Sequence, residues 1–208
     1  MRPKADFYTK LTDKQKEICL GSLLGDMNIN VNMQGKCRIS MFHCLEQKEY
    51  LYWFYNELKN FVKTPPKNVV QHDKKQNRYY PQMRFSTLTY DAFGKLYDLC
   101  YSNDGKKYVT EEWLKLIKDS ALALAIWYMD DGTLGTDNHC TLATCSFSLE
   151  EHDLLIDLLA NWNLGVKVIT MGKHEHIYFS VEEADAFFKI IKPFVLPSMQ
   201  YKLGAKKT

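Results

Sequence analysis

Two acidic residues, Asp26 and Asp131, each stand at the end of a mostly apolar helical run and are separated by about half of the 208-residue chain. A helix C-terminus carries roughly half a negative charge, which disfavours a nearby carboxylate by about 0.3 to 1 kcal/mol. Because a bound cation would reverse this penalty, and because carboxylate oxygens suit Mg²⁺, the pair predicts a metal centre at which the two acids meet.

Both runs also carry small residues four positions apart, Gly21 and Gly25 in the first and Ala121 and Ala125 in the second. Residues at this spacing share one helix face and allow another backbone to come close. A glycine inside a helix costs about 1 kcal/mol relative to alanine, so a compensating helix contact is expected. We therefore expect the two runs to pack side by side and in parallel.

Elements of the same kind recur in the same order along the two parts of the chain. In the first part, the pattern predicts helices over 12–25, 45–61 and 89–101 and strands over 27–32, 36–43, 68–72 and 78–86. In the second part, after a short helical stretch over 111–117, it predicts helices from Ser120 to Asp131 and over 149–163 and 182–193, and strands over 134–136, 140–146, 166–171 and 176–181. This duplication predicts an α+β fold with an N-terminal half (1–104), a connection (105–118) and a C-terminal half (119–208), related by a pseudo-twofold axis.

Polar side chains alternate with apolar ones along the predicted strand 78–86. One face of such a strand can pack on helices while the other offers guanidinium and amide groups, which suit guanine and adenine in the DNA major groove. A solvated sheet face is the alternative. The candidate DNA-binding residues are Asn28, Asn30, Arg38, Ser40, Arg78, Tyr80, Gln82, Arg84, Lys167, His174, His176 and Tyr178.

Composition and net charge limit which partners and which cellular compartment can be inferred. The formal net charge of +2 and the pI near 8.1 are too low to establish a nucleic-acid partner. Whether the protein binds nucleic acid therefore has to be judged from where its charged residues lie. The six cysteines form no CxxC pair, and the N-terminus lacks an apolar signal run, which favours an intracellular protein with reduced thiols. Lysines near both ends, among them Lys206 and Lys207, are candidate phosphate contacts.

Several segments together resemble one known family. Besides the two acidic runs, they include Phe85-Ser86-Thr87, the closing Ile191-Lys192-Pro193-Phe194, and the segment from Pro197 to Leu203. In this order they resemble the LAGLIDADG homing endonucleases, in particular the monomers with two copies of the motif. The resemblance implies two αββαββα halves with saddle-shaped antiparallel sheets, and the motif helices packed at their interface. It also implies intron homing through double-strand cleavage of a long, asymmetric DNA target, with Mg²⁺ as cofactor and Mn²⁺ as a substitute.

The resemblance also implies roles for individual residues. The metal-binding acids of the family fall on Asp26 and Asp131, and its basic residues beside the catalytic water fall on Lys107 and Lys202. The length of the connection leaves Lys106 as a rival to Lys107. The backbone carbonyls at the two helix ends, those of Gly25 and Asp130, are expected to supply further metal ligands.

The first motif differs from the family pattern at one position, and one histidine near it has two interpretations. The first motif continues Gly25-Asp26-Met27, so it lacks the glycine that Gly132 supplies after the second motif. His43 is a possible neighbour of the active site, although a histidine of the core or surface fits its position equally well.

Other functions remain open. A protein of the same fold could act as an intron RNA splicing factor (maturase) or as a DNA-binding protein that does not cleave. The tetrapeptide Tyr128-Met129-Asp130-Asp131 also occurs at the centre of reverse transcriptases, but there the acids lie in a strand turn, whereas here the run is helical. A zinc site formed by His174 and His176 with Cys140 or Cys145 lacks a regular four-ligand spacing.

Overall fold

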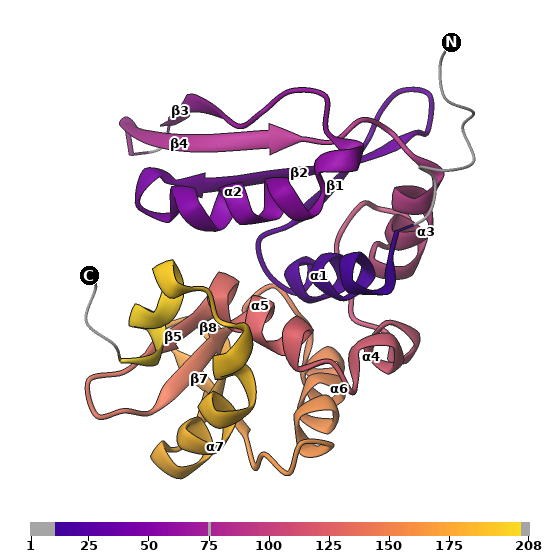
Figure 1. Cartoon of the computed structure of the whole chain (residues 1–208). Coiled ribbons are helices and arrows are strands. Elements are labelled where there is room, and N and C mark those ends of the chain that lie inside the picture. The colour runs from indigo at the N-terminus through magenta and orange to yellow at the C-terminus, as the bar shows by residue number, and fades with distance from the viewer. Residues whose placement is uncertain (1–10, 75, 205–208) are drawn as a thin grey trace. The chain divides into compact units, whose positions relative to one another are not determined.

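The computed structural model describes residues 11–74 and 76–204, which form two compact units (Figure 1). The first unit comprises the described parts of Met1–Lys16 and Asp26–Tyr97, and the second comprises those of Glu17–Gly25 and Asp98–Thr208. Helix α1 (Asp13–Leu23) contributes residues to both units. No helix among the described residues is long and apolar enough to cross a membrane.

The first unit contains a four-stranded antiparallel sheet in the order β1-β2-β4-β3. Its strands are β1 (Asn28–Val31), β2 (Cys37–Cys44), β3 (Lys67–Asp73) and β4 (Arg78–Ser86). It also contains α2 (Lys48–Glu57) and all but the last three residues of α3 (Asp91–Cys100). Helix α2 packs on β2 and β4, which buries every second residue of β2. The opposite face of the sheet is left open for polar side chains.

The second unit repeats this arrangement with a sheet in the order β5-β6-β8-β7. Its strands are β5 (Gly132–Leu134), β6 (Cys140–Ala143), β7 (Lys167–Met171) and β8 (His174–Phe179), and its helices are α4 (Glu111–Ile117), α5 (Ala121–Asp131), α6 (Leu149–Ala160) and α7 (Val181–Ile191). The matching strand orders confirm the predicted duplication and the α+β class. Helix α5 is the core of this unit, since all its residues from Ala123 to Met129 are buried.

Local sequence signals explain where the motif helices begin. Thr12 and Gln15 exchange side-chain to backbone hydrogen bonds of 3.1 and 3.2 Å, the reciprocal pattern of a capping box, before α1. The Ser120 hydroxyl accepts a bond of 3.0 Å from the amide of Ala123 and caps α5. Both caps agree with the sequence prediction.

The strand that follows α5 differs from the prediction in its position. It begins at Gly132, directly after the helix, instead of at residue 134. Gly132 has φ −75° and ψ 143°, so its conformation is extended and any residue could adopt it. Glycine is required there for a different reason: a Cβ would overlap the ring of Tyr128. The glycine that follows the second motif is therefore needed for the packing of Tyr128 and not for a left-handed helix end.

Candidate active site and DNA-binding faces

Two segments of the second unit run in parallel: residues 17–25, which comprise the end of α1 and the turn after it, and α5. Near their beginnings, the Ser120 hydroxyl donates a hydrogen bond of 2.6 Å to the Glu17 carboxylate. Near their ends, the Ser22 hydroxyl donates one of 2.6 Å to the Asp130 carboxylate. The N-terminal parts of the two segments are thus in contact with each other, and so are their C-terminal parts. This confirms the predicted parallel packing of the two runs.

Glycine allows these two segments to approach closely. A Cβ at Gly21 would lie 2.6 Å from the carbonyl oxygen of Ala123 and 2.7 Å from its Cα, so no larger residue fits without moving a backbone. At Gly25 a Cβ would again be too close to α5. The contact on α5 differs from the prediction: Gly21 meets Ala123 and not the strip formed by Ala121 and Ala125. The crossing of the helix axes sets this contact, and spacing within one helix does not determine it.

A lysine ammonium lies at the C-terminal end of each segment. Lys107 Nζ donates a hydrogen bond of 2.6 Å to the Gly25 carbonyl. Lys202 Nζ, from the 3-10 helix Pro197–Leu203, donates bonds of 2.6 Å to the Met129 carbonyl and 3.1 Å to that of Asp130. Gly25 and Asp130 each directly precede a motif acid, so the two lysines occupy equivalent positions in the duplicated pattern.

The structure distinguishes Lys107 from its neighbour. Lys106 Nζ is exposed and lies 3.4 Å from the carboxylate of Asp104, in the turn that precedes it. Alternation along the extended segment turns adjacent side chains to opposite sides, which explains why only Lys107 points to the helix end. Of the two candidates left open by the sequence, Lys107 is the one at the Gly25 carbonyl.

The lysines also explain how acids are tolerated at these helix ends. A cation near a helix C-terminus is stabilised by about 0.3 to 1 kcal/mol, and its charge offsets that of an adjacent carboxylate. The carbonyls of Gly25 and Asp130, expected as metal ligands, accept these lysine hydrogen bonds. A carbonyl oxygen has two lone pairs, so this contact leaves room for a second partner.

Asp130 occupies the position in the second motif that Gly25 occupies in the first, and only Asp130 has a side chain there. Its carboxylate accepts the bond from Ser22, and its Cβ occupies the space over Gly25, where a second Cβ would lie only 2.5 Å away. The missing side chain of Gly25 thus makes room for the side chain of Asp130. Asp131, the next residue and the last of α5, is half-buried.

The 3-10 helix that carries Lys202 is fixed to α5 by a tyrosine. Tyr128 donates a hydrogen bond of 2.8 Å from its hydroxyl to the backbone carbonyl of Lys202. Burial raises the pKa of the Tyr128 hydroxyl far above its usual range, so it stays protonated and remains a donor. The tetrapeptide Tyr128–Asp131, which also occurs in reverse transcriptases, lies in helix α5 here. Its tyrosine holds the backbone of Lys202 against this helix.

In the first unit, Asp26 lies beside a histidine. His43 Nδ1 is 3.7 Å from an Asp26 carboxylate oxygen, and the Asn28 amide donates a bond of 3.0 Å to the Asp26 carbonyl. The His43 ring is buried and packs on Tyr50 and Phe54, with centroid distances of 5.0 and 6.2 Å. His43, which the sequence left undecided, is thus a neighbour of a motif acid.

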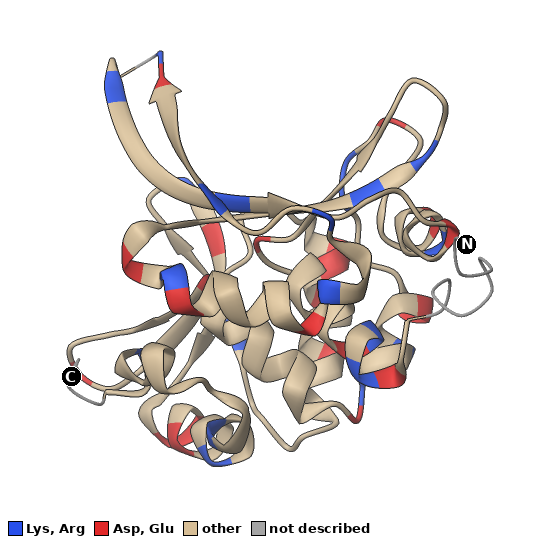
Figure 2. Ribbon diagram, turned by 45° about the horizontal axis from the view of Figure 1, so that its top comes forward, with Lys and Arg blue, Asp and Glu red and all other residues tan. Residues whose placement is uncertain are grey.

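The strand register places all candidate DNA-binding residues of the first unit on one face of its sheet. Asn28 pairs with Ser40 and Asn30 with Arg38, and the alternation carries this face across β4. Figure 2 shows Lys and Arg at intervals along these strands. The predicted residues on the face are Asn28, Asn30, Arg38, Ser40, Arg78, Tyr80, Gln82 and Arg84.

Sequence reasoning missed Lys67 and Gln71 of β3, which are directly opposite Arg84 and Tyr80. Polar and apolar residues do not alternate along β3, so its sequence gave no signal for this face.

The second unit has a corresponding face. Lys167 pairs with Tyr178, and its ammonium lies 5.3 Å from the centre of that ring. His176 and His174 follow on the same side of β8. Cys140 pairs with Phe179 and so points to the opposite face, which removes it from any zinc site with these histidines.

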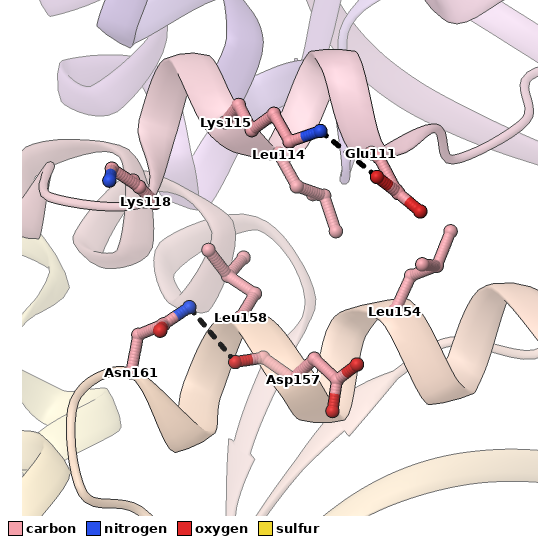
Figure 3. Close-up of a pocket in the computed structure, with 8 residues that line it drawn as sticks. All are labelled: Glu111, Leu114, Lys115, Lys118, Leu154, Asp157, Leu158 and Asn161. Carbon is pink, nitrogen blue, oxygen red and sulfur yellow. Dashed lines mark hydrogen bonds and ion pairs between the residues drawn. The ribbon is translucent and has the colours of Figure 1, made fainter.

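A hollow also lies between α4 and α6 (Figure 3). It measures about 330 Å³, and Leu114, Leu154 and Leu158 contribute its apolar surface. A salt bridge of 2.9 Å between Lys115 and Glu111 lies at its edge. No motif acid and neither helix-end lysine lines it, so it has no part in the candidate active site.

Comparison with known proteins agrees with these features. The profile of the LAGLIDADG DNA endonuclease family matches residues 16–187. The chain is 29% identical to DNA endonuclease I-ChuI of Chlamydomonas applanata, over 93% of this chain and 96% of the other. It is 31% identical to cytochrome b mRNA maturase bI2 of Debaryomyces hansenii, over 95% of this chain and 76% of the other.

Longer proteins and solved structures also match. The chain is 31% identical to protein RecA of Mycolicibacterium chitae over 93% of its own length, but it spans only about half (47%) of that relative. Its fold matches that of the homing endonuclease I-WcaI bound to its DNA recognition sequence, with a TM-score of 0.84 and 23% identity over 98% of this chain and 94% of the other. With its duplicated sheets, its two acidic helix ends and this family match, the chain belongs to the LAGLIDADG DNA endonuclease family.

Proposed function

We propose that this protein is a site-specific homing endonuclease that makes a double-strand break in a long, asymmetric DNA target by metal-dependent phosphodiester hydrolysis. The observation that carries the proposal is the repeated helix end. In each copy, a backbone carbonyl that accepts a lysine hydrogen bond directly precedes a carboxylate, at Gly25 and Asp26 and at Asp130 and Asp131. Two such arrangements suit an enzyme that hydrolyses one phosphodiester in each strand.

The residues at the helix ends fit a hard divalent cation. Asp26 and Asp131 offer carboxylate oxygens, and the carbonyls of Gly25 and Asp130 offer further oxygen ligands. This donor set suits Mg²⁺, with Mn²⁺ as a substitute, and a structure of the relative I-DmoI was solved with DNA and Mn. Bound there, the metal would neutralise charge on the phosphate and lower the pKa of a water molecule.

The protein residues would complete the chemistry. Lys107 and Lys202 hold fixed positions at the two helix ends, from which each ammonium can orient a water molecule beside one scissile phosphate. The open faces of the two sheets carry the polar side chains proposed to contact bases. We propose that the protein acts as a monomer inside the cell, because a duplicated chain supplies both sets of residues.

Selection of cleaved sites from a random DNA library with Mg²⁺ tests this function and yields the target sequence. With that target, Asp131→Asn should abolish double-strand cleavage, because the amide lacks the charge that binds the metal, while DNA affinity stays measurable. Asp137→Asn, a change of the same kind in the turn between β5 and β6, is the matched control and should cut normally. A fully active Asp131→Asn protein would refute the role of this acid.

Intron RNA splicing is the second candidate, and the match to a cytochrome b mRNA maturase over 76% of that relative favours it. The two functions are separated by assaying cleavage of intronless DNA and splicing of intron-containing RNA with the same preparation. Stimulated splicing without any DNA cleavage would establish the maturase and exclude the nuclease.

A further inference from the structure

A cationic hollow lies at one edge of the open sheet face in the first unit. It measures about 290 Å³, and four basic residues line it: Arg38, Lys63, Lys67 and Arg84. Among the described residues, its lining contains no carboxylate. The sequence indicated Arg38 and Arg84 as base contacts but gave no reason to connect Lys63 or Lys67 with them.

The strand register explains why this hollow exists. The pairing of β3 with β4 ends at Lys67 and Arg84, so the following residues of β4 have no strand beside them on that side. The chain before β3 is held there instead, by a hydrogen bond of 2.8 Å from the Leu88 amide to the Phe61 carbonyl. This brings Lys63 next to the end of the sheet, where Ser86 also lines the hollow.

The arrangement is unfavourable unless an anion is present. Lys67 and Arg84 are directly opposite each other on neighbouring strands, and like charges in this position destabilise a sheet. No salt bridge among the described residues compensates these two or Arg38 and Lys63. A tetrahedral oxyanion that accepts several hydrogen bonds at once would remove the repulsion.

We infer that this hollow binds a phosphodiester group of the DNA backbone, and that Arg38 and Arg84 act there as phosphate ligands instead of base readers. The inference rests on the proposed DNA-binding function but not on cleavage. A phosphate site at the edge of the sheet would fix how the duplex lies on the open face, so that Arg78 and Gln82, farther along β4, can reach base edges.

The test uses a fluorescent duplex of random sequence, because non-specific binding depends on phosphates and requires no known target. Affinity is measured by anisotropy at several salt concentrations for the wild type, Lys67→Gln and Lys63→Gln. The slope of log K against log salt is negative, and each lost phosphate contact should reduce its magnitude by about 0.9, which corresponds to roughly eightfold weaker binding at 0.1 M salt. Lys115→Gln, which removes the same charge from α4, is the control and should change neither quantity.

Arg84→Lys separates a phosphate ligand from a base reader. Because a lysine also binds phosphate, this variant should keep most of the non-specific affinity and of the salt slope. Unchanged slopes in Lys67→Gln and Lys63→Gln would overturn the inference, as would a wild type without affinity for duplex DNA. A wild type that binds but cuts no library site would contradict the proposed nuclease and leave the phosphate site supported.

Discussion

Replacing Gly21 by alanine should separate the two parallel helical segments of the second unit. The added Cβ would lie 2.6 Å from the Ala123 carbonyl oxygen and 2.7 Å from its Cα, and both atoms belong to a helix backbone that cannot rotate away. Overpacking of this kind costs about 1 to 3 kcal/mol, and the better helix propensity of alanine returns about 1 kcal/mol. We expect a net loss of up to about 2 kcal/mol, or a melting temperature lower by up to about 8 °C.

Gly94 provides a matched control for this experiment. It lies inside α3, and a Cβ there would meet no atom within 4 Å. Gly94→Ala should therefore raise the melting temperature by about 2 to 4 °C, because only the gain in helix propensity remains. Thermal unfolding followed by circular dichroism measures both variants.

The same substitution should reduce activity more than stability. The carbonyl that accepts the bond from Lys107 is four residues beyond Gly21, and a displacement of about 1 Å at a reacting group can lower a rate by roughly 100-fold. Cleavage is measured well below the melting temperature of the variant. If Gly21→Ala is as stable and as active as Gly94→Ala, the close contact does not hold the helix ends, and the reasoning is wrong.

Two further predictions concern Lys202 and the buried thiols. Lys202→Met should slow hydrolysis of one strand by about 100-fold or more while Lys107 still serves the other, so nicked plasmid should accumulate; Lys106→Met should yield linear product as the wild type does. Burial raises the pKa of the Cys19 and Cys140 thiols from 9.0 to about 12, and it raises that of the Cys100 thiol further, so their stabilising effect is complete below pH 9 and is lost as the pH rises toward 12. The free energy of unfolding from urea titrations should fall by about 4 kcal/mol between pH 8 and 10, or about 1.4 kcal/mol for each of these three thiols. Cys19→Ala should remove about a third of this decrease, while Cys145→Ala, at an exposed thiol, should leave it unchanged; equal curves for both variants would contradict the assignment.

The sequence predicted most elements because their signals are local. The capping residues before α1 and α5 and the alternation along β4 depend on neighbours only a few positions away. A predicted boundary was wrong where one element passes directly into another, at Gly132, which begins β5 immediately after α5. The glycine at that point is explained by the ring of Tyr128, four residues earlier in the helix, which a strand pattern does not reveal.

The candidate site was predictable only in part. Acids at helix ends are conspicuous in a sequence because the helix dipole disfavours them, so Asp26 and Asp131 were identified from their placement. Lys107 could not be separated from Lys106 in the same way, since its contact with Gly25 spans 82 residues. The place of His43 beside Asp26 likewise follows from the return of β2 along β1.

By itself, the sequence determined the duplicated order of helices and strands, the two acidic helix ends and the polar faces of the sheets, because each follows from residue spacing within one element. Only the tertiary structure decided which helix residues touch, which lysine reaches each helix end, and how four basic residues gather at the edge of one sheet. These contacts join residues distant in the chain, and they depend on helix crossing and strand register, which no local pattern specifies.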